Sequence, residues 1–456
     1  MTTMLSRPEV VPDAGALEGG FLDRLRAGFA ENPRYRLAQN AVTQVTADDV
    51  ALNRAIVSRT DHTFSQVLDD WSVTNQKASG RCWIFAGLNL LRAGAMRRMN
   101  LKDFEFSQTY AHFWDKVERA NYFLEAIIQT ADRQVDDRSV AYLLDHPVDD
   151  GGQWNMFVNL VQKHGVVPKA LMPESESSGN TRRMNSILVA ALRQGAKSLR
   201  DLHARGVTAD ELRGAKEETL SAVYRIASIH LGTPPDRFEW QWNDKDRGFH
   251  RDGLLTPQEF AARYVDVPLD DFVCLVNDPR ESSPYGRTFT VEHLGNVVEG
   301  GIVKYLNVPI ETIKEIAMRT LLDGEPVWFG CDTGKMMRRD LGVWDAKLFD
   351  YETLYDTAFV HDKAARLEYH QTLMTHAMLF TGVDVADGQP RRWRVENSWG
   401  AENSGRKGFF VMNDNWFDEH MFEIAARRSS LSTELQAALD QEPIVLPAWD
   451  PMGSLA

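Results

Sequence analysis

The fold of this chain is decided by residues 76–85, which have the sequence QKASGRCWIF. An apolar run follows Gly80 and continues to Leu91, and it predicts a buried helix over residues 82–92. Cys82 would then lie in the first turn of that helix. The free amides and the positive dipole end of a helix N-terminus stabilise a thiolate. Cys82 is therefore expected to be a nucleophile with a low pKa.

Two distant residues complete a set suited to thiol acyl transfer. His376 lies in the run THAM at 375–378, and Asn397 lies in ENSWG at 396–400. The imidazole would pair with the thiolate, protonate the leaving amine and activate water, while Asn397 would fix the imidazole tautomer. The side-chain amide of Gln76 and the backbone amide of Cys82 would donate to the oxyanion. The four residues together predict a cysteine peptidase.

Each of these residues has a commoner explanation when it is taken alone. A single cysteine in an apolar run is usually a small buried hydrophobe, which is our interpretation of Cys274 and Cys331. A single histidine is more often a core or surface residue, and an Asn-Ser pair is usually a turn. The enzyme interpretation depends on finding four suitable residue types in the expected chain order.

The local sequences resemble the papain superfamily of cysteine peptidases. Residues 79–83, SGRCW, are similar to its Cys-Gly-Ser/Ala-Cys-Trp pattern, but Ser79 replaces the first cysteine, so the disulfide anchored there cannot form. Residues 397–400, NSWG, match the asparagine motif of the superfamily. This resemblance implies that Trp399 covers the hydrogen bond between His376 and Asn397 from solvent.

Within that superfamily the chain resembles the bleomycin hydrolase and aminopeptidase C branch. Four runs carry the resemblance: residues 76–85, DGGQW at 150–154, residues 396–400, and LPAWDPMGSLA at 446–456. It implies an α+β fold of the papain type, with a helical lobe, a β-barrel-like lobe and a helical insertion. It also implies that Gly151 and Gly152 line the cleft, where glycine lets an extended peptide approach the backbone closely.

Hydrophobic periodicity agrees with a helical first half and a strand-rich second half. Besides 82–92, helices are predicted over 154–164, ending at Gly165, and over 309–322, with Pro309 in the first helical position. Short apolar or alternating runs predict strands at residues 326–330, 377–383, 392–396 and 409–412.

Spacing along the chain predicts five segments. Cys82 and His376 are 294 residues apart, so roughly 150 residues are inserted relative to the papain pattern. Helical periodicity places a helical hairpin or small bundle within a mainly helical insertion at 179–300. The other predicted segments are an N-terminal oligomerisation arm at 1–60, the helical lobe at 61–178, the strand-rich lobe with histidine and asparagine at 301–440, and a C-terminal arm at 441–456.

The resemblance to this branch also has implications for the assembly and for the C-terminal arm. It implies a homohexamer that encloses its active sites, and an arm that lies in the cleft on the nonprime side. A carboxylate at Ala456 would then meet the free α-amine of a peptide substrate, which predicts an aminopeptidase acting through a thioester. The alternatives are a hydrolase of non-peptide amides or thiolactones and a structural ring with vestigial catalytic groups.

Composition and missing motifs exclude several other classes. With 51 basic and 65 acidic residues the net charge is −14, which makes nucleic acid an unlikely partner. No run of eighteen apolar residues and no apolar leader is present, so neither a membrane span nor secretion is expected, and the predicted location is cytoplasmic. Residues 330–335, GCDTGK, lack the spacing of a phosphate loop, and no metal motif occurs; neither a cofactor nor a metal is expected.

Overall fold

The computed structural model describes residues 15–68, 71–402 and 404–455. Two compact units divide the chain. One contains the described residues up to 58 together with 347–360, and the other contains 59–346 together with the described residues from 361 onward. Among the described residues, no helix is both long enough and apolar enough to cross a bilayer.

Short helices make up the first unit. Asn32 caps the second of them by accepting from the amide of Arg34, and Pro33 occupies its first turn, where its missing N–H is no loss. A hydrogen bond of 2.8 Å from Tyr35 to Asp356 joins the two stretches of this unit. Its helices are α1 (Gly19–Glu31), α2 (Pro33–Val42), α3 (Ala47–Ala51) and α14 (Tyr351–Tyr355), and α4 (Arg54–Arg59) follows α3 at the unit boundary.

The helical part of the second unit contains the predicted helix of the thiol. The helix that starts at Cys82 is almost completely buried over 18 residues, as its apolar sequence predicts. The helix predicted at 154–164 is present with those bounds, and it ends at Gly165, whose φ of +71° suits glycine. The helices here are α5 (Cys82–Met99), α6 (Gln108–Gln129), α7 (Arg138–Asp145), α8 (Trp154–His164) and the 3₁₀ turn η2 (Lys169–Leu171).

A mainly antiparallel sheet forms the strand-rich part. Strand β10 lies near its middle, between β7 and β11, and the four predicted strands correspond to β7, β10, β11 and β12. The strand order is β14-β5-β6-β4-β13-β7-β10-β11-β12-β9-β8, and β1 also pairs with β10. The bounds are β1 (Gln66–Val67), β4 (Phe272–Val276), β5 (Thr288–Val291), β6 (Tyr305–Asn307), β7 (Val327–Cys331), β8 (Met337–Arg338), β9 (Val343–Trp344), β10 (His376–Ala386), β11 (Gln389–Glu396), β12 (Phe409–Asn413), β13 (Met421–Arg427) and β14 (Ile444–Leu446).

Helices and turns surround this sheet. The predicted helix at 309–322 is α13 (Ile310–Leu322), but Pro309 is its N-cap and not its first helical residue, because the proline backbone is extended at ψ 150°. The remaining elements are α15 (Lys363–Glu368), α16 (Asp414–His420), α17 (Thr433–Leu439), η3 (Leu269–Asp271), η4 (Arg428–Ser430) and η5 (Pro451–Gly453).

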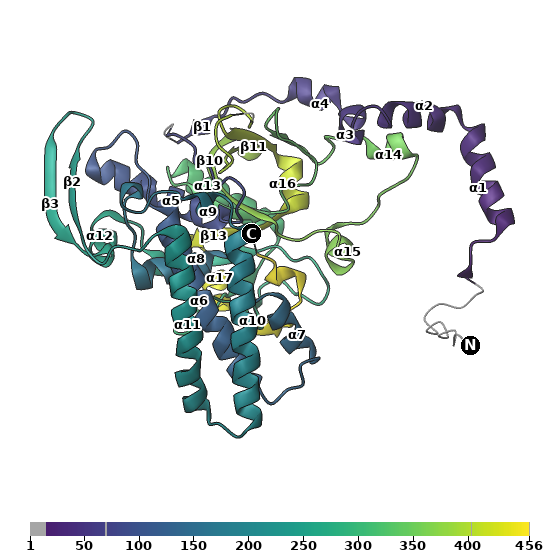
Figure 1. Ribbon diagram of the computed structural model, residues 1–456. Coiled ribbons are helices and arrows are strands. Elements are labelled where there is room, and N and C mark those ends of the chain that lie inside the picture. The colour runs from purple at the N-terminus through teal and green to yellow at the C-terminus, as the bar shows by residue number, and fades with distance from the viewer. Residues whose placement is uncertain (1–14, 69–70, 403, 456) are drawn as a thin grey trace, which may run out of the picture. The chain divides into compact units, whose positions relative to one another are not determined.

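Residues 179–300 contain the predicted helical hairpin. After the short helix α9 (Glu176–Gly179), the long helices α10 (Arg182–Ala204) and α11 (Ala209–Leu231) pack side by side (Figure 1). A two-stranded hairpin of β2 (Phe238–Asn243) and β3 (Phe249–Leu255) and the helix α12 (Pro257–Tyr264) follow. Strands β4 and β5 also fall in this range, although they belong to the main sheet.

Candidate active site

Cys82 is the first residue of α5, at the helix end where backbone amides have no partner within the helix. Its side chain is buried, and the backbone amide of Ala377 contacts the thiol. This contact brings the start of α5 against the first residues of β10, where His376 lies. Two predicted site residues that are far apart in sequence are thus held by neighbouring elements.

His376 and Asn397 form the predicted hydrogen bond, with 2.9 Å between His376 Nε2 and Asn397 Oδ1. The backbone amide of Ser398 donates to the same Oδ1 at 2.7 Å, which identifies this atom as the amide oxygen. The imidazole must therefore donate from Nε2. Its other nitrogen, Nδ1, is left with a free lone pair and can serve as the base.

Burial acts on both members of the expected ion pair. It raises the pKa of the Cys82 thiol to about 11, against the lowering effect of the amides of Ala377, Trp83 and Cys82 itself. It also lowers the pKa of His376 to about 4, although the Asn397 bond opposes this. The predicted low pKa of the thiol is therefore not found in this covered site, where either charge alone would be poorly solvated.

Trp399 lies against the imidazole as the resemblance implied. The two rings are stacked, with their centroids 5.1 Å apart and their planes at 30°. The guanidinium of Arg339 covers the same indole, 4.8 Å from its ring centroid. The indole therefore restricts the access of water to the bond between His376 and Asn397.

The side-chain amide of Gln76 is held at both ends. Its Oε1 accepts from Ser398 Oγ at 2.6 Å, and its Nε2 donates to the carbonyl of Ser79 at 2.5 Å. The backbone amide of Gln76 also donates to the Ser398 carbonyl at 2.8 Å. One proton of the Nε2 group has no partner in these contacts, so it can be donated to an oxyanion near Cys82.

The two predicted cleft glycines have different surroundings. A Cβ on Gly152 would be 2.5 Å from the indole of Trp83, so only glycine fits beside the residue that follows the thiol. The carbonyl of Gly151 accepts from Arg119 Nη2 at 2.7 Å, which leaves it less available to a substrate. Gly151 is partly exposed and Gly152 is buried.

The C-terminal residues lie between the glycine segment and the segment before His376. The carbonyl of Ser454 accepts from Gln153 Nε2 at 2.6 Å, and Ser454 Oγ donates to the carbonyl of Met374 at 2.7 Å. Further back, Arg280 pairs with Asp450 at 2.9 Å. Ala456, the predicted partner of a substrate amine, lies outside the described residues.

Sequence reasoning missed a buried carboxylate next to Asn397. Glu396 accepts from Asn89 Nδ2 at 2.9 Å, from Arg92 at 2.7 Å and from Trp71 Nε1 at 2.5 Å. Burial raises the pKa of Glu396, while Arg92 acts to lower it. These bonds fasten the end of β11 to α5 and so fix Asn397 relative to the thiol. The sequence offered a signal, because Asn89 and Arg92 are polar residues within the apolar run of α5.

Comparisons with known proteins agree with this geometry. Residues 16–453 match the model of the Peptidase C1-like family, and the chain belongs to that family. It is 45% identical over 446 residues to a bleomycin hydrolase of Gallus gallus, covering 96% of this chain and 97% of that protein. It is 43% identical over 442 residues to an aminopeptidase C of Streptococcus thermophilus, covering 97% and 99% respectively.

A solved structure supports the same conclusion. The crystal structure of PepW from Lactobacillus rhamnosis HN001 superposes with a TM-score of 0.95 at 43% identity, covering 97% of this chain and all of that chain. The predicted α+β papain-like fold and the predicted branch of the superfamily are thereby confirmed. The chain is a thiol-dependent peptidase of that family.

Proposed function

We propose that this protein is a thiol aminopeptidase that removes N-terminal residues from peptides through a thioester intermediate. The class of enzyme follows from the family and from relatives that carry the name aminopeptidase C. The observation that carries the assignment of roles is the hydrogen bond between His376 Nε2 and Asn397 Oδ1, because it leaves Nδ1 free to act as a base on the residue before Ala377, whose amide contacts the thiol.

The proposed reaction first forms a thioester and then hydrolyses it. Nδ1 of His376 takes the proton of Cys82, and the thiolate attacks the carbonyl carbon of the first residue of the peptide. The carbonyl oxygen becomes an anion that accepts from Gln76 Nε2 and from the amide of Cys82. The imidazolium protonates the leaving amine, and the neutral imidazole then activates a water that cleaves the thioester.

The contacts of Ser454 support a role of the C-terminal arm in selecting free N-termini. We propose that an arm held by Gln153 and by the Met374 carbonyl takes up space that an internal peptide segment would need. Asp149, Glu292 and the cationic Arg119 line the pocket around Leu455.

Helix α1 supports the proposed homo-oligomer. Phe21, Leu25 and Phe29 recur every four residues and so share one face of the helix, and they are 41%, 52% and 45% exposed. None of the residues of α1 is buried within the described chain. A row of exposed apolar side chains is typical of a protein interface, and we propose a second copy of this chain as its cover.

All three cysteines, Cys82, Cys274 and Cys331, are free thiols in the structure. A thiol nucleophile with two further free cysteines fits a reducing compartment, so we propose a cytoplasmic location.

The test compares one peptide in two forms, with a free and with an acetylated N-terminus. We expect the enzyme to cleave the first peptide bond of the free form and to leave the acetylated form intact, as measured by mass spectrometry of the products. Cleavage of both forms at similar rates would contradict the aminopeptidase assignment. Measurement of the assembly mass on the same sample tests the proposed oligomer.

A further inference from the structure

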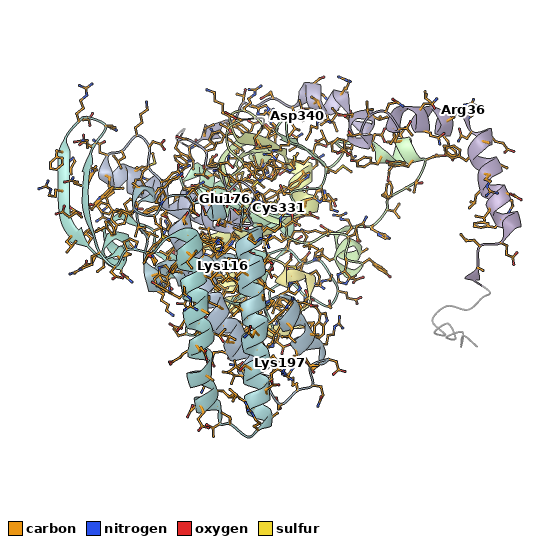
Figure 2. All side chains as sticks on the ribbon, in the orientation of Figure 1. Arg36, Lys116, Glu176, Lys197, Cys331 and Asp340 are labelled. Atoms are coloured by element: carbon orange, nitrogen blue, oxygen red, sulfur yellow. The ribbon has the colours of Figure 1, made fainter. Side chains whose placement is uncertain are left out.

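The carboxylate of Asp150 joins the loop before the thiol to the helical insertion. Asp150 Oδ2 accepts from the backbone amide of Gly80 at 3.3 Å and from the hydroxyl of Thr181. Its Oδ1 accepts from Asn185 Nδ2 at 2.7 Å and lies 2.7 Å from Lys116 Nζ. Thr181 and Asn185 belong to the start of α10, and Lys116 of α6 is labelled in Figure 2.

Asp150 contacts the chain on both sides of Cys82. Its carboxylate holds the amide of Gly80, and its backbone carbonyl accepts from Trp83 Nε1 at 2.7 Å. Burial acts to raise the pKa of Asp150, but Lys116, together with His112 and the Thr181 hydrogen bond, outweighs this effect and holds the pKa well below its usual value. The side chain therefore remains a charged acceptor, and hydrogen bonds to a charged acceptor are among the stronger ones.

A second carboxylate repeats this arrangement one residue further along the loop. The guanidinium of Arg81 is fully buried and makes a two-pronged pair with Glu174, at 3.0 and 2.7 Å. Ser178 Oγ of α9 donates to the same carboxylate at 2.6 Å. The backbone amide of Ala78 donates to the Gly179 carbonyl at 3.0 Å. The segment that leads into α10 thus lines the loop 76–82.

Thr181 has an unusual use for a residue in its position. It is the N-cap of α10, where a threonine side chain normally accepts from a backbone amide of the first helical turn. Thr181 makes no such bond, and its hydroxyl donates to Asp150 instead. The N-cap side chain of α10 therefore binds the carboxylate of Asp150 and does not cap its own helix.

We infer that Asp150 is a positioning residue for the nucleophile loop and that the start of α10 holds Asp150 in place. The helical insertion thereby sets the positions of the donors that face the oxyanion, a role for it that depends on the proposed function. Ser79 precludes a disulfide at this loop, and the two carboxylates fasten the loop in its absence.

The test removes one of the two contacts from the start of α10, that of Thr181, and leaves Asp150 in place. Thr181→Val keeps the shape of the side chain and loses the donor. We expect kcat for a free-amine peptide to fall by about tenfold or more, with KM nearly unchanged, because a small displacement of the oxyanion donors weakens only the transition state. Alkylation of Cys82 by iodoacetamide forms no oxyanion, so its rate should change much less. Thr181→Ser, which keeps the hydroxyl, should restore kcat.

A matched control weakens the insertion elsewhere. Thr208 caps α11 at the other end of the helical hairpin through a capping box with Glu211. Thr208→Ala should destabilise the hairpin by removing the cap of α11 and leave kcat unchanged. A Thr181→Val enzyme with the kcat of the wild type would overturn the inference. Equal losses of kcat and of the alkylation rate in Thr181→Val and Thr208→Ala would also overturn it. Failure of the wild-type enzyme to cleave free-amine peptides would instead overturn the proposed function.

Discussion

Ser398 Oγ donates a hydrogen bond of 2.6 Å to Oε1 of Gln76, 322 residues away in the sequence. This bond fixes which end of the Gln76 amide faces Cys82, because an oxygen that already accepts cannot exchange places with the nitrogen at no cost. The asparagine motif thus does more than supply Asn397. Its next residue, Ser398, orients the proposed oxyanion donor Gln76.

Gln76→Ala should lower kcat by about 10²–10³-fold with a smaller effect on KM, because it removes one oxyanion donor. Ser398→Ala should lower kcat less, since the amide remains but can rotate. Steady-state kinetics of both single variants and of the double variant separate these effects. Ser398→Ala should add little once Gln76 is absent, and additive losses would show that Ser398 acts by another route.

Cys82→Ala should abolish peptide cleavage and leave the fold intact, because the removed Sγ atom is the proposed nucleophile. Circular dichroism checks the fold, and the release of N-terminal residues checks the activity. Cys274→Ala serves as the matched control, because that thiol is also buried but donates to Asn155 at 3.1 Å. Turnover by a folded Cys82→Ala protein would remove this thiol from the mechanism.

Deletion of residues 453–456 should weaken the preference for free N-termini. The contacts of Ser454 with Gln153 and Met374 are lost, and the cleft becomes open to longer peptides. We expect the truncated enzyme to cleave N-acetylated peptides that the full chain leaves intact. Continued rejection of acetylated peptides would show that the arm is not the selective element.

Glu423 should make stability fall as the pH rises. Burial raises the pKa of this carboxyl from 4.5 to about 8, against a smaller lowering effect of Cys274. The folded state therefore holds the proton more tightly than the unfolded state does. This contribution to stability is complete below pH 4.5 and is lost as the pH rises through 8.

Glu423→Gln removes this ionisation and should flatten the dependence. Between pH 5 and pH 8 the wild type should lose roughly 3–4 kcal/mol more of its free energy of unfolding than Glu423→Gln does. Urea unfolding at both pH values measures the difference. The same pH dependence of the free energy of unfolding in the two proteins would contradict the assignment of this ionisation to Glu423.

Local patterns were enough to predict the elements that surround the site. The helix at 154–164 followed from apolar residues at helical spacing and from Gly165, and its observed bounds agree. A strand was predicted at 377–383 from a short apolar run, and the observed strand extends from His376 to Ala386. Both predictions use only the pattern of apolar residues within a short stretch of sequence, which periodicity detects well.

Contacts between distant residues could not be predicted in the same way. The role of Asp150 depends on Thr181 and Asn185, which belong to a helix whose docking site leaves no mark in the sequence pattern. The low pKa predicted for Cys82 considered the helix end and not the burial of the thiol, which only the packed structure reveals. Tertiary packing therefore decides the electrostatics of the site, while local sequence decides its elements.

The bond from Gly80 to Asp150 also has a consequence for local unfolding. The amide proton of Gly80 can exchange with solvent deuterium only when its bond to the carboxylate opens. Thr181 and Asn185 hold the same carboxylate, so fraying of the first turn of α10 removes two of its bonds and leaves that of Lys116. The protection of the Gly80 amide should therefore fall when that turn opens.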